Sequence, residues 1–452
     1  MIIALIILVN LLFYIRTMNY AGICDDIPIF NLVREIPKGK WMYFWYHLHG
    51  YKYKEWKLPH IQTLSIHTLN CILIYIVFGM NYTSLIAALL FSVNPVNNQC
   101  SIWMSGKCYS MNTTYSLLMW CFPLTSPLIY LFATYFCGAS IILFPLVFLF
   151  TKYWWLAGIV GLGLYREYKR IFNKSPNSKF MTESNTELKS IKPRKIILFF
   201  KTLGYHFINA IFALRIGFYH KYMFLHGVSK ETNKDSYKID KYFFIGIGVV
   251  CLTLATLNPG LIWFCVTLSM WCNIISFNQT LTNRYVYLPN VGLTYFVATL
   301  LIHFPYLAVG LFAYYATKLM NFIPFYKNEY WSIEHSCWEQ HDFFYPWQNR
   351  SVHCFQSGNF HGALANMIKA NELRPNDWKI SYNLVQIYML LGNLGEAKNW
   401  YTKAEACTID GRADAIKALM EHLKEWMEQV ELYAKEHNNT VSIDTKHIDM
   451  QR

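Results

Sequence analysis

The chain has 452 residues, of which 54% are hydrophobic and only 15% are charged, a balance too apolar for an ordinary soluble protein of this length. The formal net charge is +13, but no basic stripe with interleaved aromatic residues marks a nucleic-acid interface. We therefore expect the basic residues to contact the phosphate groups of anionic membrane lipids and not nucleic acid.

Apolar runs in the first 323 residues predict membrane spans. The run over 2–15 is followed by Arg16 and lacks both a basic leader and a small-residue cleavage site, so we expect an uncleaved first span. Further spans are expected at about 61–79, 84–103, 110–123, 125–137, 139–151, 153–165, 241–257, 260–280, 286–303 and 308–323. The predicted fold class is all-α, a polytopic membrane bundle of about eleven spans.

Two long segments between these spans are expected to lie outside the membrane. Residues 17–60 are rich in Trp, Tyr and His, and residues 166–240 form a basic loop with amphipathic helices. The first segment follows one expected span, the second follows seven and the C-terminal region follows eleven. Because all three numbers are odd, these three regions would face the side opposite the N-terminus. The rule that cytoplasmic loops are basic weakens for long loops, so charge alone leaves open which side is the cytoplasm.

The C-terminal region contains an internal repeat. Gly358 and Gly392 are 34 residues apart, which is the period of a tetratricopeptide repeat. Small residues recur in the same register at Ala363 and Ala397 and at Ala370 and Ala404. The predicted parts are an aromatic linker over 324–343, two tetratricopeptide repeats over 344–411, a capping helix over 412–437 and a disordered tail over 438–452. An ordinary pair of helical hairpins is the alternative.

An acidic pair, Asp25 and Asp26, lies a few residues after the first span. Two adjacent carboxylates raise each other's pKa, which suits one of them to accept a proton from a hydroxyl group. The alternative is a solvated helix N-cap, because Asp before Ile27 and Pro28 is also a common helix start.

Two polar segments interrupt the apolar runs on the same predicted side. The first extends from Asn94 to Lys107, and the second from Asn283 to Pro289. Lys107 and Arg284 are suited to hold a phosphate group, which at this face would belong to a lipid. The alternative is that both are ordinary interfacial cations.

Together, these features resemble the transmembrane and tetratricopeptide-repeat containing O-mannosyltransferases, glycosyltransferases of the GT-C fold. The resemblance follows the same order along nearly the whole chain. It rests on Asp25-Asp26 before a Trp-rich loop, the segment from His60 to Trp103, the match of 284–289 to Arg-Tyr-x-Tyr-Leu-Pro, and the terminal repeats.

The resemblance implies a multi-pass enzyme with a cytoplasmic N-terminus. Such enzymes transfer one mannose-like sugar from a polyprenyl-phosphate donor, such as a dolichol-linked one, to an acceptor hydroxyl on the luminal or periplasmic face. A protein acceptor would be bound by the repeats. The implied site residues are Asp25 as general base with Asp26 beside it, Lys107, Arg284, Tyr285 and Tyr287 at the donor phosphate, and Asn94, Asn97, Gln99 and Trp103 lining the site.

The chain also departs from the family pattern. Relatives typically read His-Pro-Val-His-x-Glu where this chain has Asn94, Asn97 and Gln99, and Tyr109 replaces a usual acid. Amides are poor metal ligands in this context, so we expect no metal and no cofactor besides the donor substrate. Two accounts stay open, a divergent transferase or a catalytically inactive membrane scaffold that binds proteins through its repeats. A transporter of polyprenyl-linked glycans is a third, but the sequence lacks the internal repeats of that class.

The 12 cysteines contain no CxxC pair and no spacing typical of a metal site. Cys100 with Cys108, and Cys337 with Cys354, could form disulfides if their side of the membrane is oxidising, which the sequence alone leaves open.

Overall fold

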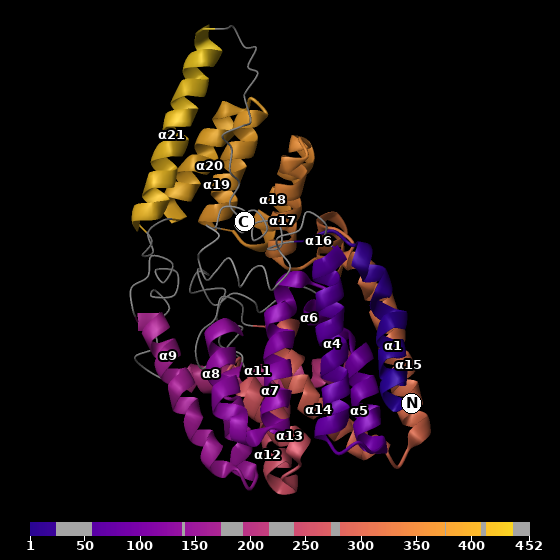
Figure 1. Cartoon of the computed structure of the whole chain (residues 1–452). Helices are drawn as coiled ribbons and strands as arrows, with labels where there is room; N and C mark the ends of the chain where they lie inside the picture. The colour runs from indigo at the N-terminus through magenta and orange to yellow at the C-terminus, as the bar shows by residue number, and fades with distance from the viewer. Residues whose placement is uncertain are drawn as a thin grey trace, which may run out of the picture. The chain divides into compact units, whose positions relative to one another are not determined.

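The computed structural model describes residues 1–23, 57–137, 141–172, 193–216, 239–272, 281–375, 377–407 and 413–436. These residues form helices and no strands, which confirms the predicted all-α class for this part of the chain (Figure 1). The chain divides into two compact units, Met1–Ser332 and Ile333–Arg452.

Three helical segments of the described residues are long and apolar enough to cross a membrane, Ile2–Asn19, Lys57–Val77 and Lys195–Phe212. The first joins α1 (Ile2–Tyr14) to the 3₁₀ helix η1 (Ile15–Asn19), the second is α4, and the third lies in α11 (Pro193–Phe212). The coarse expectation of apolar spanning helices is thus met, whereas the number eleven is not established.

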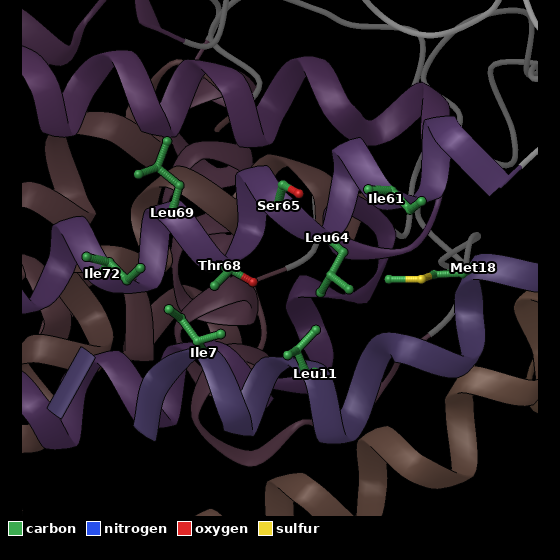
Figure 2. A pocket seen from close by; sticks show the side chains of 9 residues that line it. All are labelled: Ile7, Leu11, Met18, Ile61, Leu64, Ser65, Thr68, Leu69 and Ile72. Carbon is green, nitrogen blue, oxygen red and sulfur yellow. The ribbon is translucent and has the colours of Figure 1, made fainter. Parts of the chain in front are cut away.

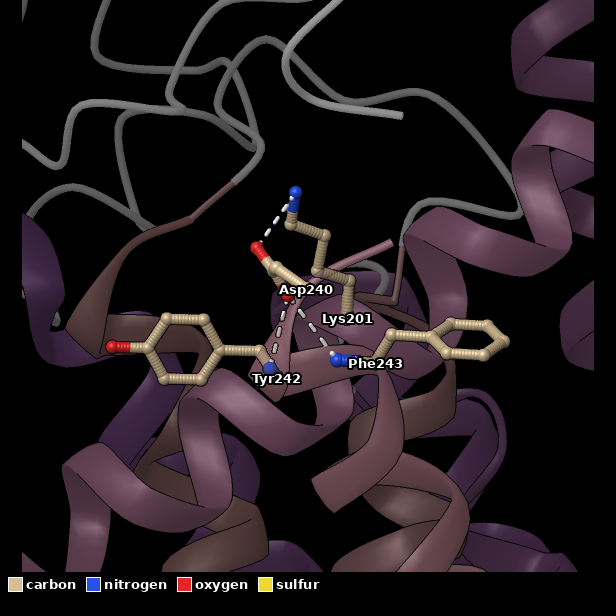
Figure 3. A network of polar contacts seen from close by, with 4 residues as sticks. All are labelled: Lys201, Asp240, Tyr242 and Phe243. Carbon is tan, nitrogen blue, oxygen red and sulfur yellow. Dashed lines mark hydrogen bonds and ion pairs between the residues drawn. The ribbon is translucent and has the colours of Figure 1, made fainter. Parts of the chain in front are cut away.

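The helix α11 lies within 166–240, which the sequence placed outside the membrane. Its Lys201 would normally argue against a span, but the Nζ atom of Lys201 forms an ion pair with Asp240 at 2.9 Å and the side chain is largely buried. Asp240 also accepts hydrogen bonds from the backbone N–H groups of Tyr242 and Phe243 and so begins α12 (Lys241–Thr256) (Figure 3). One carboxylate therefore both caps α12 and neutralises a lysine of α11.

The segment predicted as one span over 84–103 is broken in the structure. The helix α5 (Tyr82–Val93) ends at Asn94, whose backbone is extended and whose side chain accepts a bond from Val96 N–H. Two short helices follow, η2 (Pro95–Asn97) and α6 (Asn98–Ser101). Pro95 has no N–H to continue the helical ladder, which explains the break.

The expected spans at 139–151 and 153–165 are also not single α-helices. They contain the 3₁₀ helices η6 (Phe144–Phe150) and η7 (Trp154–Ile159), followed by α9 (Val160–Phe172). A 3₁₀ helix rises about 2 Å per residue, so seven residues cover about 14 Å, roughly half of the 30 Å hydrocarbon layer. Apolar composition alone did not distinguish these short packed segments from full spans.

The other helices of the first unit follow the predicted apolar segments more closely. They are α7 (Lys107–Cys121), α8 (Ser126–Cys137), α13 (Pro259–Ser269), α14 (Tyr287–Leu301) and α15 (Pro305–Phe322), with η3 (Met104–Gly106), η4 (Pro123–Thr125), η10 (Asn283–Val286) and η11 (Ile323–Tyr326) between them. The helix α4 packs against α5 and α7, and α13 packs against α14. Buried apolar side chains from these helices form the core of the unit.

The second unit begins within α16 (Glu329–Glu339) and continues as paired helices. The pairs are α17 (Phe344–Gln356) with α18 (Phe360–Leu373), and α19 (Trp378–Leu390) with α20 (Leu394–Cys407). Gly358 and Gly392 occupy the equivalent turns with φ of +77° and +74°, a conformation that glycine adopts without steric cost. The long helix α21 (Ala413–Glu436) contributes Leu423, Met427 and Val430 to the core around α19 and α20.

Candidate functional site

The guanidinium group of Arg284 lies among three aromatic rings. Its Cζ atom is 5.4 Å from the ring centre of Trp103, 6.0 Å from that of Tyr109 and 5.7 Å from that of Tyr285. Trp271 extends this aromatic group by stacking on Tyr285 with ring centres 4.0 Å apart. Such rings attract a cation through their electron-rich faces and hold it without cancelling its charge.

The backbone at Arg284 is fixed by Gln99, which belongs to the short helix α6. The Oε1 atom of Gln99 accepts a hydrogen bond from the Arg284 N–H at 3.1 Å and another from the Thr282 hydroxyl at 3.0 Å. Gln99 is fully buried. The sequence predicted that Gln99 lines the site; the structure gives its side-chain oxygen the role of fixing η10, which carries Arg284.

Lys107 is the first residue of α7 and only 1% of it is exposed. Its Nζ atom donates a hydrogen bond to the Oε1 atom of Gln62 on α4 at 3.0 Å. A buried ammonium group is costly unless polar groups surround it, so this position is built to hold a charge. Tyr109, whose ring contacts Arg284, also belongs to the first turn of α7.

Trp103 connects this region to the N-terminal segment. Its indole N–H donates a hydrogen bond to the carbonyl oxygen of Ile23 at 3.2 Å. Ile23 is buried and is the last described residue before the gap. Asp25 and Asp26 themselves lie outside the described residues.

Burial raises the pKa of the Tyr285 phenol, and the neighbouring positive charge of Arg284 acts in the opposite direction. The phenol therefore stays neutral near pH 7, and it cannot neutralise the guanidinium group as a phenolate would. Tyr285 thus acts on Arg284 through its π face and through a hydrogen bond between the phenol oxygen and the guanidinium group.

Asn94 and Asn97 are fully buried and bond to backbone oxygens of neighbouring helices. The amide of Asn94 donates to the carbonyl of Ala210 at 2.9 Å, and that of Asn97 donates to Phe91 at 2.8 Å. Asn97 also accepts a bond from Asn290 on α14 at 3.0 Å. These amides connect α5, α11 and α14.

Tyr287 lies apart from the aromatic group, in a buried polar network of the helix bundle. Its hydroxyl is 2.6 Å from Nδ1 of His67 and 3.4 Å from Nδ2 of Asn70, both on α4. The Nε2 atom of His67 is in turn 3.1 Å from the carbonyl of Ser92, which also accepts a bond from Tyr14. The sequence analysis missed this network, although polar His67 and Asn70 within an apolar run were the available signal.

Among the residues that the structure describes, no group of three or more His, Cys, Asp or Glu side chains is arranged to hold a metal ion. The four cysteines considered above, Cys100, Cys108, Cys337 and Cys354, do not form disulfides in this structure. No protein-family model, curated protein or solved structure matches this chain in the three comparisons made, so its function has to be argued from the site itself.

Proposed function

We propose that this chain is a GT-C type membrane glycosyltransferase that moves one mannose-like sugar from a polyprenyl-phosphate donor to an acceptor hydroxyl, on a protein and on the luminal or periplasmic face. The observation that carries the proposal is that Trp103, which anchors Ile23, also contacts Arg284 and is followed four residues later by the buried cation Lys107. Asp25 follows Ile23 by only two residues in the sequence.

These residues suit a direct displacement at the anomeric carbon. Asp25 takes the proton of the acceptor hydroxyl, the new glycosidic bond forms, and the bond from the anomeric carbon to the phosphate oxygen breaks. The lipid phosphate leaves with the bonding electrons, and Lys107 and Arg284 stabilise its charge. Transition states of this kind place most of their new charge on the leaving group, so fixed cations contribute strongly.

The buried setting of the cations supports a role in phosphate binding. Lys107 is nearly inaccessible to solvent and Arg284 is only partly exposed, which keeps water from screening their charge. Interfacial cations with no function usually extend into solvent instead. The repeat helices of the second unit are proposed to bind the protein acceptor.

The decisive experiment is Asp25→Asn in the full-length protein reconstituted with polyprenyl-phosphate mannose and an acceptor peptide. We expect the rate of sugar transfer to fall by about 10²–10⁴-fold, because the general base is lost, while donor affinity stays within about twofold. Unchanged transfer in the variant removes Asp25 from the mechanism. A wild-type protein that binds the donor but transfers nothing contradicts the transferase.

The alternative function is a membrane scaffold that binds proteins through its C-terminal helices. It is favoured by the amides at Asn94, Asn97 and Gln99, which stand where the resembled family has ionisable residues and which bond to the protein itself. A scaffold would retain its partners in the Asp25→Asn variant and lose them when residues 344–452 are removed. A transferase whose repeats select the acceptor would keep transferring sugar to a minimal acceptor after the same deletion.

A further inference from the structure

An open apolar groove of about 400 Å³ runs between α1 and α4 in the first unit (Figure 2). Its lining residues are Ile7, Leu11, Met18, Ile61, Leu64, Ser65, Thr68, Leu69 and Ile72. Leu64 forms the floor and is 4% exposed, whereas Ile7, Leu11 and Leu69 are about 40% exposed at the rims. Both walls belong to segments that are long and apolar enough to cross a membrane.

The dimensions of the groove fit one hydrocarbon chain. On α4 the lining extends from Ile61 to Ile72, eleven steps along the helix, which is about 16 Å at 1.5 Å per residue. A groove of this length and volume holds an extended chain of methylene groups, whereas a helix with its side chains is about 10–12 Å wide and would cover the groove instead of entering it.

The length also distinguishes between kinds of lipid. About 16 Å matches half of the roughly 30 Å hydrocarbon layer, which is the depth that one acyl chain of a phospholipid occupies in its leaflet. A polyprenyl chain is much longer than this and would leave most of its length outside the groove. The groove is thus matched to an acyl chain.

Two cations of these segments lie near the same end of the groove, because Arg16 precedes the lining residue Met18 by two positions and Lys57 precedes the lining residue Ile61 by four. Lys57, the first residue of α4, is exposed and precedes Ile61 by four residues, so both project from the same face of the helix. The segments α1, η1 and α4 contain no acidic residue. If the acyl chain of a lipid followed the groove towards Ile72, the headgroup of that lipid would therefore lie next to Lys57.

We propose that the groove between α1 and α4 binds one acyl chain of an anionic phospholipid, with the headgroup phosphate against Lys57. The groove lining contains none of the residues assigned to the donor, and the proposal does not depend on the transferase activity. The second acyl chain of the lipid stays in the surrounding bilayer. Ser65 and Thr68 are the two polar residues among those that line the groove, and neither carries a charge that could pair with a phosphate group.

The test uses the full-length protein in detergent, stripped of lipid and titrated with dioleoylphosphatidylglycerol or dioleoylphosphatidylcholine, with bound lipid counted by native mass spectrometry. Ser65→Trp and Leu69→Trp fill the groove from exposed positions and should weaken binding of the most tightly held phosphatidylglycerol at least tenfold. Ile76→Trp, on the same helix but beyond the lining, is the matched control and should bind like the wild type.

Lys57→Gln should reduce the preference for phosphatidylglycerol over phosphatidylcholine about fivefold, the contribution of one cation at the membrane surface. Both lipids should still bind. Equal binding by Ser65→Trp, Leu69→Trp and Ile76→Trp would overturn the groove assignment. Binding of decaprenyl phosphate in the groove at least tenfold tighter than phosphatidylglycerol would overturn the choice of an acyl chain. All of these readouts are independent of sugar transfer, so failure of the transferase proposal leaves them interpretable.

Discussion

At the scale of single residues, the two cations of the candidate site are held by different means. Arg284 contacts aromatic faces, and Lys107 donates to a side-chain oxygen of Gln62. A planar guanidinium group stacks on rings, whereas a lysine ammonium is a compact point charge that needs oxygen partners. The two side chains are therefore not interchangeable at these positions.

For the donor phosphate, we expect Lys107→Gln and Arg284→Gln each to weaken binding of a non-hydrolysable polyprenyl-phosphate sugar analogue at least tenfold. Hydrogen bonds to charged groups contribute about 1.5–3 kcal/mol, which corresponds to a change of this size. Isothermal titration in detergent measures it. Lys152→Gln, at an exposed lysine, is the control, and wild-type affinity in both site variants would make Lys107 and Arg284 ordinary interfacial cations.

Tyr287→Phe separates the buried polar network from the donor site. Removing the hydroxyl leaves Nδ1 of His67 without this partner in a buried position, which should destabilise the protein by about 1–3 kcal/mol. Donor affinity should stay within twofold of the wild type, and a thermal unfolding series in one detergent measures the stability. Lost donor affinity with unchanged stability would show that Tyr287 binds the donor as the sequence predicted.

His335 on α16 predicts a pH dependence of the second unit. Burial lowers its pKa to about 4, against about 6.5 in an unfolded chain. Above pH 6.5 neither state binds the proton, and between pH 6.5 and 4 the unfolded state binds it more tightly, so stability falls as the pH falls. At pH 5 the loss is about 2 kcal/mol.

Hydrogen exchange of peptides covering α16 at pH 7.5 and pH 5, corrected for intrinsic rates, measures this loss. His335→Gln should remove the difference between the two pH values, whereas His341→Gln, at an exposed histidine, should retain it. The same pH difference in both variants would assign the effect to other groups.

At the scale of helices, α11 and α12 approach so closely that neither tolerates a side chain at the contact. A Cβ atom on Gly204 would meet the carbonyl of Tyr242, and one on Gly246 would meet the carbonyl of Phe200. The nearby ion pair between Lys201 and Asp240 fixes the same contact (Figure 3). Gly248, two residues further along α12, has open space around it.

We therefore expect Gly246→Ala to destabilise the protein by about 1–3 kcal/mol, since both backbones must shift to admit the methyl group. Gly248→Ala is the matched control, and it should be neutral or stabilise by up to about 1 kcal/mol because alanine favours the helix. Thermal unfolding of the two variants compares them directly. Equal effects of both substitutions would contradict the close contact between α11 and α12.

At the scale of the whole molecule, the expected topology depends on whether α11 crosses the membrane. Lys201 lies near the middle of α11 and pairs with Asp240, the residue that precedes α12. If α12 starts at the membrane surface, the middle of α11 lies at that surface too. The half of α11 that enters the membrane then has about ten residues and is about 15 Å long, which is half of the hydrocarbon layer. In that case α11 would not cross the membrane.

The corresponding prediction is that 17–60, 166–240 and 324–452 face one side. Single cysteines introduced at Ser184 and Ser229, on either side of α11 in the sequence, should react with a membrane-impermeant maleimide from the same side of sealed vesicles. Labelling from opposite sides would make α11 a full span and would break the eleven-span parity. A cysteine-free background provides the control.

Much of this protein follows from its sequence alone. The apolar runs predict α1, α4, α12, α14 and α15 within a few residues, because an isolated run of apolar residues bounded by polar ones needs no distant partner to be recognised. The spacing of Gly358 and Gly392 likewise places equivalent turns 34 residues apart. In the candidate site, the sequence predicted Lys107, Arg284, Tyr285 and Trp103, and their role at a donor phosphate stays a prediction.

Tertiary structure decided the rest. Whether 144–159 forms spans or short 3₁₀ segments depends on packing, since both have the same apolar composition. Lys201 is tolerated in α11 only because Asp240, 39 positions later, neutralises it. The partners of Tyr287 and Gln99 lie about 180 to 220 residues away in the chain. Contacts at such separations are fixed by how helices pack together, which no local pattern of residues records.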